Sequence, residues 1–290
     1  FKPGYPVQAR ELNNLQSILQ NQVEQFGQHF FKEGAKVVPG NTYYNKQYNG
    51  IQLESSFLGI PISNYLGQLV GSKITGLTSG VTATATKCVL GKDSENGNPT
   101  LYVSYLGSDS TDNLQGIFAD NELLTSSIDI ISGGTTIAAG EPFGSTLVNN
   151  ANITGSAFTI KSGVYFAKGR FVEVSDQNIL LDPFGITPNY RIGLFINESI
   201  INADMNPELN DNSRGFNNYA APGADRLRIT TSLIKKDLDD FDDNNFVQLA
   251  TVENGVLKSQ TTSTEYNILQ DELARRTYAE SGDYYVKPFG

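Results

Sequence analysis

Turn-forming residues interrupt this chain every few positions, and this spacing limits the folds open to it more than any other feature. The 290 residues include 28 glycines, together with many Asn, Thr and Ser. Between the turns lie short alternating or apolar segments, of which YRIGLFINESII (190–201) is the strongest strand candidate and should lie centrally in a sheet. Short strands between regular turns are typical of all-β sandwiches and barrels. We therefore expect a mainly β fold with small β modules joined by loops and linkers.

A helix is predicted at the N-terminal end of this β fold, from about Pro6 to Phe30. Apolar residues recur there at heptad spacing, and Ile18, Val23 and Phe30 widen the stripe. Two arrangements remain open: an amphipathic helix packed on its own domain, or a short bundle between identical chains, which we expect to be trimeric. In the bundle the polar positions would fix the register. The interface residues would be Leu12, Leu15, Leu19, Gln22, Phe26 and His29.

Composition divides the chain into four parts. Residues 1–40 form the N-terminal helix and attachment segment, and 41–131 form a small β module, in which Asn49-Gly50 predicts a hairpin turn. Residues 132–157 are small and polar and predict a linker. Residues 158–290 form a β domain with an acidic run at 237–243, an Asn-rich loop at 202–224 and a short C-terminal helix. Since the chain opens without Met, we expect a longer polypeptide in which the terminal YYVKPFG leads into a further domain.

Charge and rare residues exclude several classes of function. The net charge of −10 comes without a Lys/Arg cluster, which argues against nucleic-acid binding. The lone Cys88 cannot form an internal disulfide and is expected to be a buried small hydrophobe, and a single histidine cannot build a zinc site. No apolar stretch approaches the length of a membrane span, so no membrane insertion is expected. We expect no cofactor, and synthesis in a reducing cytoplasm.

Catalytic and metal-binding motifs are also missing from the sequence. The acidic run DLDDFDDNN (237–245) could hold Ca²⁺ through carboxylate oxygens, but it lacks the EF-hand glycine and the terminal glutamate. A solvated connection between strands is the simpler interpretation. A sugar-cleaving carboxylate pair needs no motif, although the absence of Trp weakens a carbohydrate platform. There is no nucleophile elbow and no phosphate-binding loop. We therefore expect no catalytic site, no metal site and no enzymatic activity.

Four long phrases of the sequence carry a resemblance to a known family. FKPGYPVQARELNNLQSILQNQVEQFGQHFFKEG, GVYFAKGRFVEV, YRIGLFINESII and DELARRTYAESGDYYVKPF occur here in this order. Together they resemble virion structural proteins of T4-like phages, notably cyanophages. More weakly, the middle module is similar to Gly/Thr-rich β modules of phage tail proteins. The resemblance implies a virion tail component, of the baseplate or its attached fibre network, and implies no catalytic residue.

The expected function is therefore structural. It is that of a homo-oligomeric part of the tail in the virion, acting by assembly with other tail or baseplate proteins. Two alternatives remain: a receptor-binding or adhesin module that contacts the host surface, and a polysaccharide-cleaving tail spike. The position of the chain in the particle distinguishes the structural function from the receptor-binding one. An assay on host polysaccharide tests for the spike enzyme.

Overall fold

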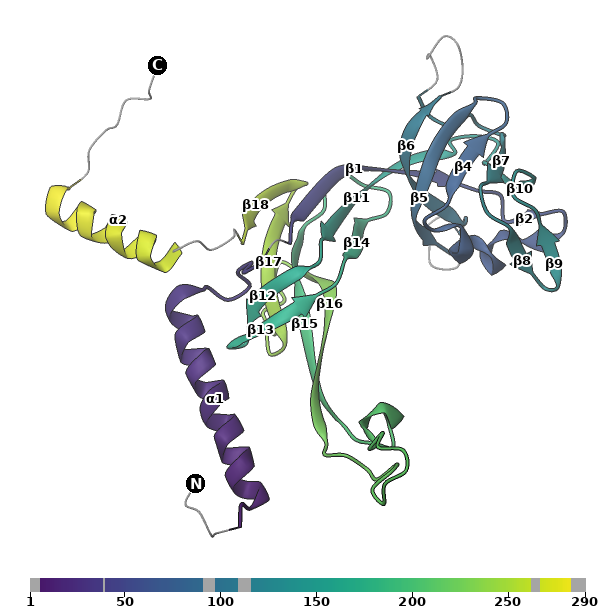
Figure 1. Ribbon diagram of the computed structural model, residues 1–290. Helices are drawn as coiled ribbons and strands as arrows, with labels where there is room; N and C mark the ends of the chain where they lie inside the picture. The colour runs from purple at the N-terminus through teal and green to yellow at the C-terminus, as the bar shows by residue number, and fades with distance from the viewer. Residues whose placement is uncertain (1–5, 39, 91–96, 109–115, 262–266, 283–290) are drawn as a thin grey trace. The chain divides into compact units, whose positions relative to one another are not determined.

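The protein is mostly β with a long N-terminal helix, which confirms the expected fold class. A computed structural model describes residues 6–38, 40–90, 97–108, 116–261 and 267–282 (Figure 1). The chain forms two compact units, built respectively from residues 1–43, 159–179 and 189–290 (unit 1) and from residues 44–158 and 180–188 (unit 2). Neither described helix is long and apolar enough to cross a membrane.

Unit 2 is built on an eight-stranded sheet to which three strands, β1, β11 and β14, also bring residues of unit 1. In sheet order the strands are β10 (Pro142–Ser145), β7 (Leu123–Ser126), β4 (Lys73–Gly76), β5 (Val81–Val89), β6 (Thr100–Ser108), β1 (Thr42–Gln52), β11 (Asn152–Ile160) and β14 (Gln177–Asp182). Smaller elements complete the unit: the hairpins β2–β3 (Ser56–Phe57, Ile60–Pro61) and β8–β9 (Ile130–Ser132, Thr135–Ile137), and the 3₁₀ turns η1 (Ile62–Asn64) and η2 (Leu66–Leu69).

One apolar core holds unit 2 together. Side chains from the inner faces of β4 to β7 meet residues of the two 3₁₀ turns there, and Cys88 packs half-buried at the edge. The fully buried Tyr65 donates a hydrogen bond of 2.5 Å to the backbone oxygen of Phe143. Burial raises the pKa of Tyr65 to about 12, because the charged phenolate would lose its hydration. The hydroxyl thus stays a donor, as a buried polar group must be satisfied.

Two sequence predictions for this region are wrong. Residues 132–157 are not a linker, since β9, β10 and most of β11 lie within them and Phe143 is fully buried. Asn49-Gly50 is not a turn either, because both residues lie inside β1 and Gly50 pairs with Tyr102. A Cβ at Gly50 would lie 3.1 Å from the Tyr102 ring, so this glycine serves close strand packing.

Unit 1 contains a four-stranded antiparallel sheet and a separate hairpin. The sheet order is β16 (Arg226–Asp237), β15 (Tyr190–Ile201), β17 (Phe246–Glu253) and β18 (Val256–Gln260), and the hairpin is β12 (Gly163–Ala167) with β13 (Arg170–Val174). The central place of β15 confirms the prediction for that segment. Two helices, α1 (Ala9–Phe30) and α2 (Asn267–Ser281), belong to this unit, and the 3₁₀ turn η4 (Pro207–Leu209) lies in the predicted Asn-rich loop.

The N-terminal segment is part of unit 1 and not a domain of its own. After α1, the backbone N–H of Gly34 donates to Phe166 and that of Phe166 donates to Ala35, so the segment pairs with β12. The helix begins at Ala9, after Pro6, because the backbone N–H of Gln8 donates to the Glu11 carboxylate and caps the first turn. Residues 283–290, where a passage into a further domain is predicted, lie outside the described residues.

Candidate oligomerisation surface

The six residues predicted to form an oligomer interface all lie on α1. Its large apolar residues are exposed: Leu19 is 54% and Phe26 is 59% accessible, and only Gly27 is buried in the whole helix. Gln22 and His29 continue the same stripe, and Nδ1 of His29 lies 2.6 Å from the backbone oxygen of Gln25. Among the residues that the structure describes, the helix therefore presents an apolar face that the single chain leaves exposed.

A different face of α1 attaches the helix to its own unit. A Cβ at Gly27 would overlap the Phe166 ring of β12, and Glu24 packs over Gly169 in the β12–β13 turn. At about 100° per residue, the centre of the predicted interface lies more than a quarter of a turn away from Gly27. Attachment and predicted self-association therefore use separate faces, and the sequence pattern revealed only the second.

The chemistry of α1 suits contact between identical chains. No charged residue occurs from Leu12 to Val23, in a chain of net charge −10. Like charges facing each other across a symmetric interface would be repelled, and this stretch carries none. Its polar positions are mostly Asn and Gln, whose amides both donate and accept hydrogen bonds and can therefore pair with their own copies.

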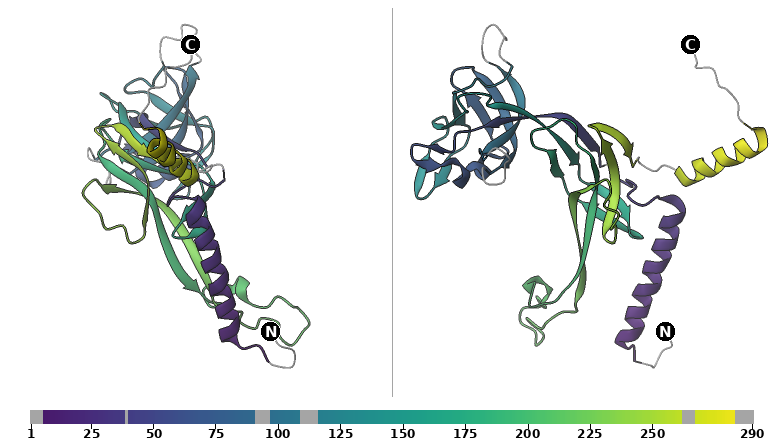
Figure 2. Two further views of the ribbon diagram at one scale, coloured as in Figure 1. Left: turned by 90° about the vertical axis from the view of Figure 1, so that its left-hand side faces the viewer. Right: turned by 180° about the vertical axis from the view of Figure 1, so that it is seen from behind.

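A second exposed structure, missed by the sequence analysis, extends from the sheet of unit 1. The strands β15 and β16 pair over twelve residues without a break, whereas β17 accompanies β15 only as far as Phe195. We call residues 197–230 the arm; Figure 2 shows it as a two-stranded ribbon closed by a loop. Its apolar residues Ile200, Met205, Phe216 and Leu227 are exposed.

The loop of the arm has a defined structure of its own. The backbone N–H of Ala220 donates to the oxygen of Asp211, and that of Asp211 donates to the oxygen of Ala221. The Asn206 side chain accepts from the N–H of Glu208 at the start of η4. The loop bounds a hollow of about 420 Å³ lined by Pro207, Glu208, Asn210, Asp211, Asn212, Arg214, Tyr219 and Ala220. Compact loops of this kind are frequently functional.

The acidic run connects β16 to β17 as an exposed loop, and two cations of unit 1 hold it. The buried Arg191 donates to both carboxylate oxygens of Asp243, at 3.2 and 2.5 Å, and Lys236 approaches Asp240 at 3.5 Å. The N–H of Asp242, with these cations nearby, keeps the pKa of Asp240 below its usual value. Among the described residues no group of three or more His, Cys, Asp or Glu could hold a metal ion.

Because Arg191 and Lys236 pair with Asp243 and Asp240, the acidic run is expected to bind no calcium. Adding a chelator should leave the melting temperature unchanged, since only an ion bound to the folded state would raise it by mass action. Scanning calorimetry with and without chelator measures this, with Asp242→Asn as a variant that removes one carboxylate of the run. A fall of several degrees in chelator would contradict the expectation.

In unit 2 a buried carboxylate binds backbone rather than a ligand. Glu122 is 1% exposed and accepts from the N–H groups of Thr78 (2.8 Å), Ser79 (2.5 Å) and Ala119 (2.8 Å), and from the Ser79 hydroxyl at 3.0 Å. A Cβ at position 76 would overlap the Glu122 carboxylate, so only a glycine there leaves room for this side chain. With both oxygens fully used, Glu122 joins two loops and is not free for acid–base chemistry.

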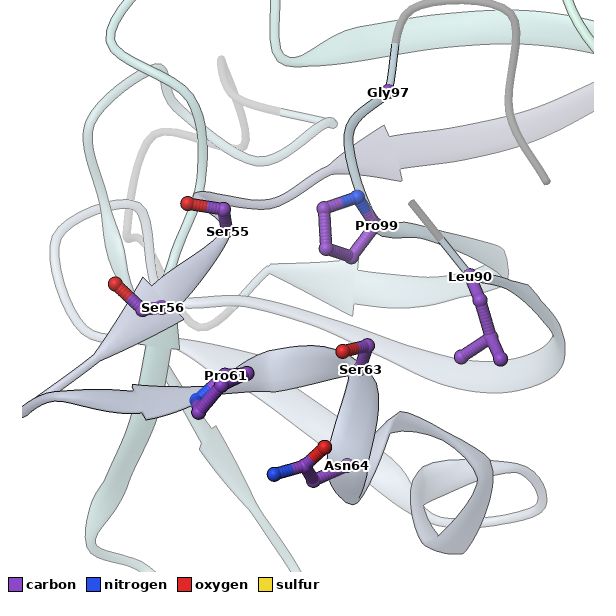
Figure 3. Close-up of a pocket in the computed structure, with 8 residues that line it drawn as sticks. All are labelled: Ser55, Ser56, Pro61, Ser63, Asn64, Leu90, Gly97 and Pro99. Atoms are coloured by element: carbon purple, nitrogen blue, oxygen red, sulfur yellow. The ribbon is translucent and has the colours of Figure 1, made fainter. Parts of the chain in front are cut away.

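The described residues that line a pocket of about 560 Å³ in unit 2 are all uncharged (Figure 3). Its lining offers hydroxyl and amide groups beside small apolar surfaces, and no titratable side chain is among Ser55, Ser56, Pro61, Ser63, Asn64, Leu90, Gly97 and Pro99. These residues can hydrogen-bond a neutral polar ligand. They cannot supply a general acid, a general base or an ionised nucleophile.

The fold and the exposed surfaces together define a mostly β protein of two units, with an amphipathic helix whose apolar face is exposed. The family described as Domain of unknown function (DUF4815) matches residues 122–290, more than half of the chain, and the chain belongs to this family. The matched residues include the arm and the β12–β13 hairpin, whereas α1 lies before them. No curated protein matches the sequence, and no solved structure matches the fold.

Proposed function

We propose that this chain is a non-catalytic structural component of a bacteriophage tail, in the baseplate or its attached fibre network. It self-associates through α1, as a trimer, and its β units contact neighbouring tail proteins. One observation carries the proposal: a long helix with an exposed apolar stripe and almost no charge. A helix of this length gains most of its stability from burying such a stripe. The resemblance of four sequence phrases to virion proteins of T4-like phages supports the place in the tail.

A second function is favoured by the pocket in Figure 3. Its hydroxyl and amide lining suits a neutral, hydroxylated ligand such as a sugar of the host surface, which would make unit 2 a receptor-binding module. A reconstruction of the tail that locates this chain separates the two. A place in the baseplate body supports the structural function, and a place at a distal tip supports the receptor-binding one.

Replacing Leu15 and Leu19 by Asp is expected to dissociate the oligomer. Both leucines are about half exposed in the single chain, so self-association would bury the other half of each side chain. Burying a whole leucine side chain contributes about 1.5–3 kcal/mol, so burying half of each of two leucines contributes about the same amount. Losing this contribution predicts a dissociation constant about ten- to hundredfold higher. Sedimentation equilibrium of the whole chain measures the constant.

The matched control places the same two charges on the polar face of α1. Asn13→Asp with Gln20→Glu adds two carboxylates to exposed positions of the helix, away from both the stripe and Ile18, and should leave the mass of the oligomer unchanged. A monomeric wild-type chain, or a Leu15/Leu19 variant that assembles as well as the control, would overturn self-association through α1.

A further inference from the structure

One face of the arm continues the core of unit 1 into solvent. Residues directly opposite each other on antiparallel strands share a face, so the pairs Ile196–Thr231, Glu198–Ile229 and Ile200–Leu227 lie on the same side. At its base this face is covered: Ile196 is buried and packs with Ala167 and Val172 of the β12–β13 hairpin. Farther out it is bare, and Ile200 is 68% exposed. The opposite face is mostly polar, with Ser199 paired to Arg228.

The cover ends at the turn of the hairpin. Arg170, the first residue after that turn, pairs with Glu198 at 3.0 Å, and the arm runs on beyond this ion pair. A two-stranded ribbon is marginally stable in water by itself. The apolar pair Ile200–Leu227 therefore lies where a further layer would complete the packing.

The helix α1 passes the same turn in the same direction. Gly27 packs at Phe166 within β12 and Glu24 packs at Gly169 in the turn, so the helix leads past the turn toward its N-terminus. The N-terminal part of α1 and the outer part of the arm thus both extend beyond the end of the β12–β13 hairpin (Figure 1). The chain's own helix does not cover the arm, since both apolar surfaces are exposed.

The stripe of α1 is also wider than a helix bundle needs. Ile18 lies outside the a and d positions, on the flank turned away from the helix face that holds Gly27. It is 48% exposed, although neither the predicted seam nor the chain's own hairpin uses it. A second surface can therefore meet α1 along this flank.

We infer that the apolar face of the arm is covered by α1 of a second copy of this chain, with Ile18 against Ile200 and Leu227. The inference rests on the proposed self-association through α1. A second copy fits because the exposed pair Ile200–Leu227 is apolar and lies just past the hairpin turn. The stretch from Leu12 to Val23 carries an exposed apolar stripe and no charge, and association through α1 brings a copy of it to this place.

Cross-linking between differently tagged chains tests the contact. In a Cys88→Ser background, chains carrying Ile18→Cys are co-expressed with chains carrying Ile200→Cys, and the assembly is treated with a short bismaleimide. A product that contains both tags is expected. The matched chain Ser199→Cys, whose thiol lies on the opposite face of the same strand, should give at least tenfold less. Equal yields, no mixed product, or a product of two Ile200→Cys chains would overturn the inference.

Sedimentation equilibrium separates this inference from the proposed function. Ile200→Asp is expected to raise the dissociation constant at least tenfold, and Ser199→Asp to leave it unchanged. If Leu15→Asp with Leu19→Asp dissociates the oligomer but Ile200→Asp behaves as Ser199→Asp, the arm contact fails and self-association stands. If the Leu15/Leu19 variant still assembles, the proposed function itself fails. Circular dichroism of each variant checks that the β units remain folded.

Discussion

Glu122→Ala is expected to destabilise unit 2 by about 4 kcal/mol, because it removes a buried carboxylate that accepts four hydrogen bonds. Three of the four donors are backbone N–H groups, and these belong to two separate loops. Glu122→Gln should cost nearly as much, since its amide N–H₂ would face N–H donors. Charge-assisted bonds of this kind are about twice as strong as neutral ones.

Hydrogen exchange followed by mass spectrometry measures this loss locally. Peptides of β4, β5 and β7 should lose protection in Glu122→Ala, while peptides of β15 and β17 in unit 1 keep theirs. Glu141→Gln removes an exposed carboxylate of the same unit and should leave all protection unchanged. Unaltered exchange in β4 would show that Glu122 contributes nothing to the stability of the unit.

Arg191→Ala is expected to destabilise unit 1 by about 3 kcal/mol. The guanidinium is buried, donates to Gln248 (2.8 Å), to the backbone of Asp240 and to Asp243, and lies 5.2 and 5.4 Å from the ring centroids of Phe241 and Phe246. Removing one partner of a buried pair usually costs about 3–5 kcal/mol, and the lower end applies because Asp243 is partly hydrated.

Urea denaturation of two variants of the acidic loop measures how much the negative charge of Asp243 contributes to stability. Asp243→Asn should lower the free energy of unfolding, because it leaves the buried guanidinium without its anion. Asp242→Asn makes the same chemical change one residue away, at a residue that Lys236 contacts through the backbone oxygen and not through the carboxylate, and should have little effect. Equal behaviour of the two variants would mean that the Arg191–Asp243 pair does not stabilise the loop.

The features that the sequence predicted are those with a local pattern. The α1 stripe repeats within three heptads, and β15 contains an apolar run from Ile192 to Ile196. Asn254-Gly255, a dipeptide typical of hairpin turns, forms the turn between β17 and β18. Asn49-Gly50 has the same local signature but lies inside a strand, because Tyr102 needs the space that the missing side chain leaves. A dipeptide does not reveal a neighbour that is distant in the sequence.

The features that the sequence analysis missed depend on distant partners. Glu122 is 44 residues from Thr78, and Arg191 is 52 residues from Asp243, so neither environment has a periodicity. Residues 132–157 resemble a linker because their strands have only a few residues each and their single large anchor is Phe143. The sequence analysis also missed the role of Gly27, which lets α1 pack closely on the Phe166 ring. The ring that would clash with a side chain at this position is 139 residues away in the sequence.

The division of unit 1 into three stretches of chain sets an order of events during synthesis. The segment after α1 pairs with β12, and Thr42 is bonded by the Gln260 side chain, 218 residues later. At about 5–20 residues per second, the ribosome releases α1 some ten to forty seconds before its unit can close. Unit 2 emerges in between and can complete its core first. Throughout this interval the apolar stripe of α1 is exposed on the growing polypeptide, so the self-association proposed for α1 can begin between neighbouring ribosomes on one messenger, before the rest of unit 1 exists.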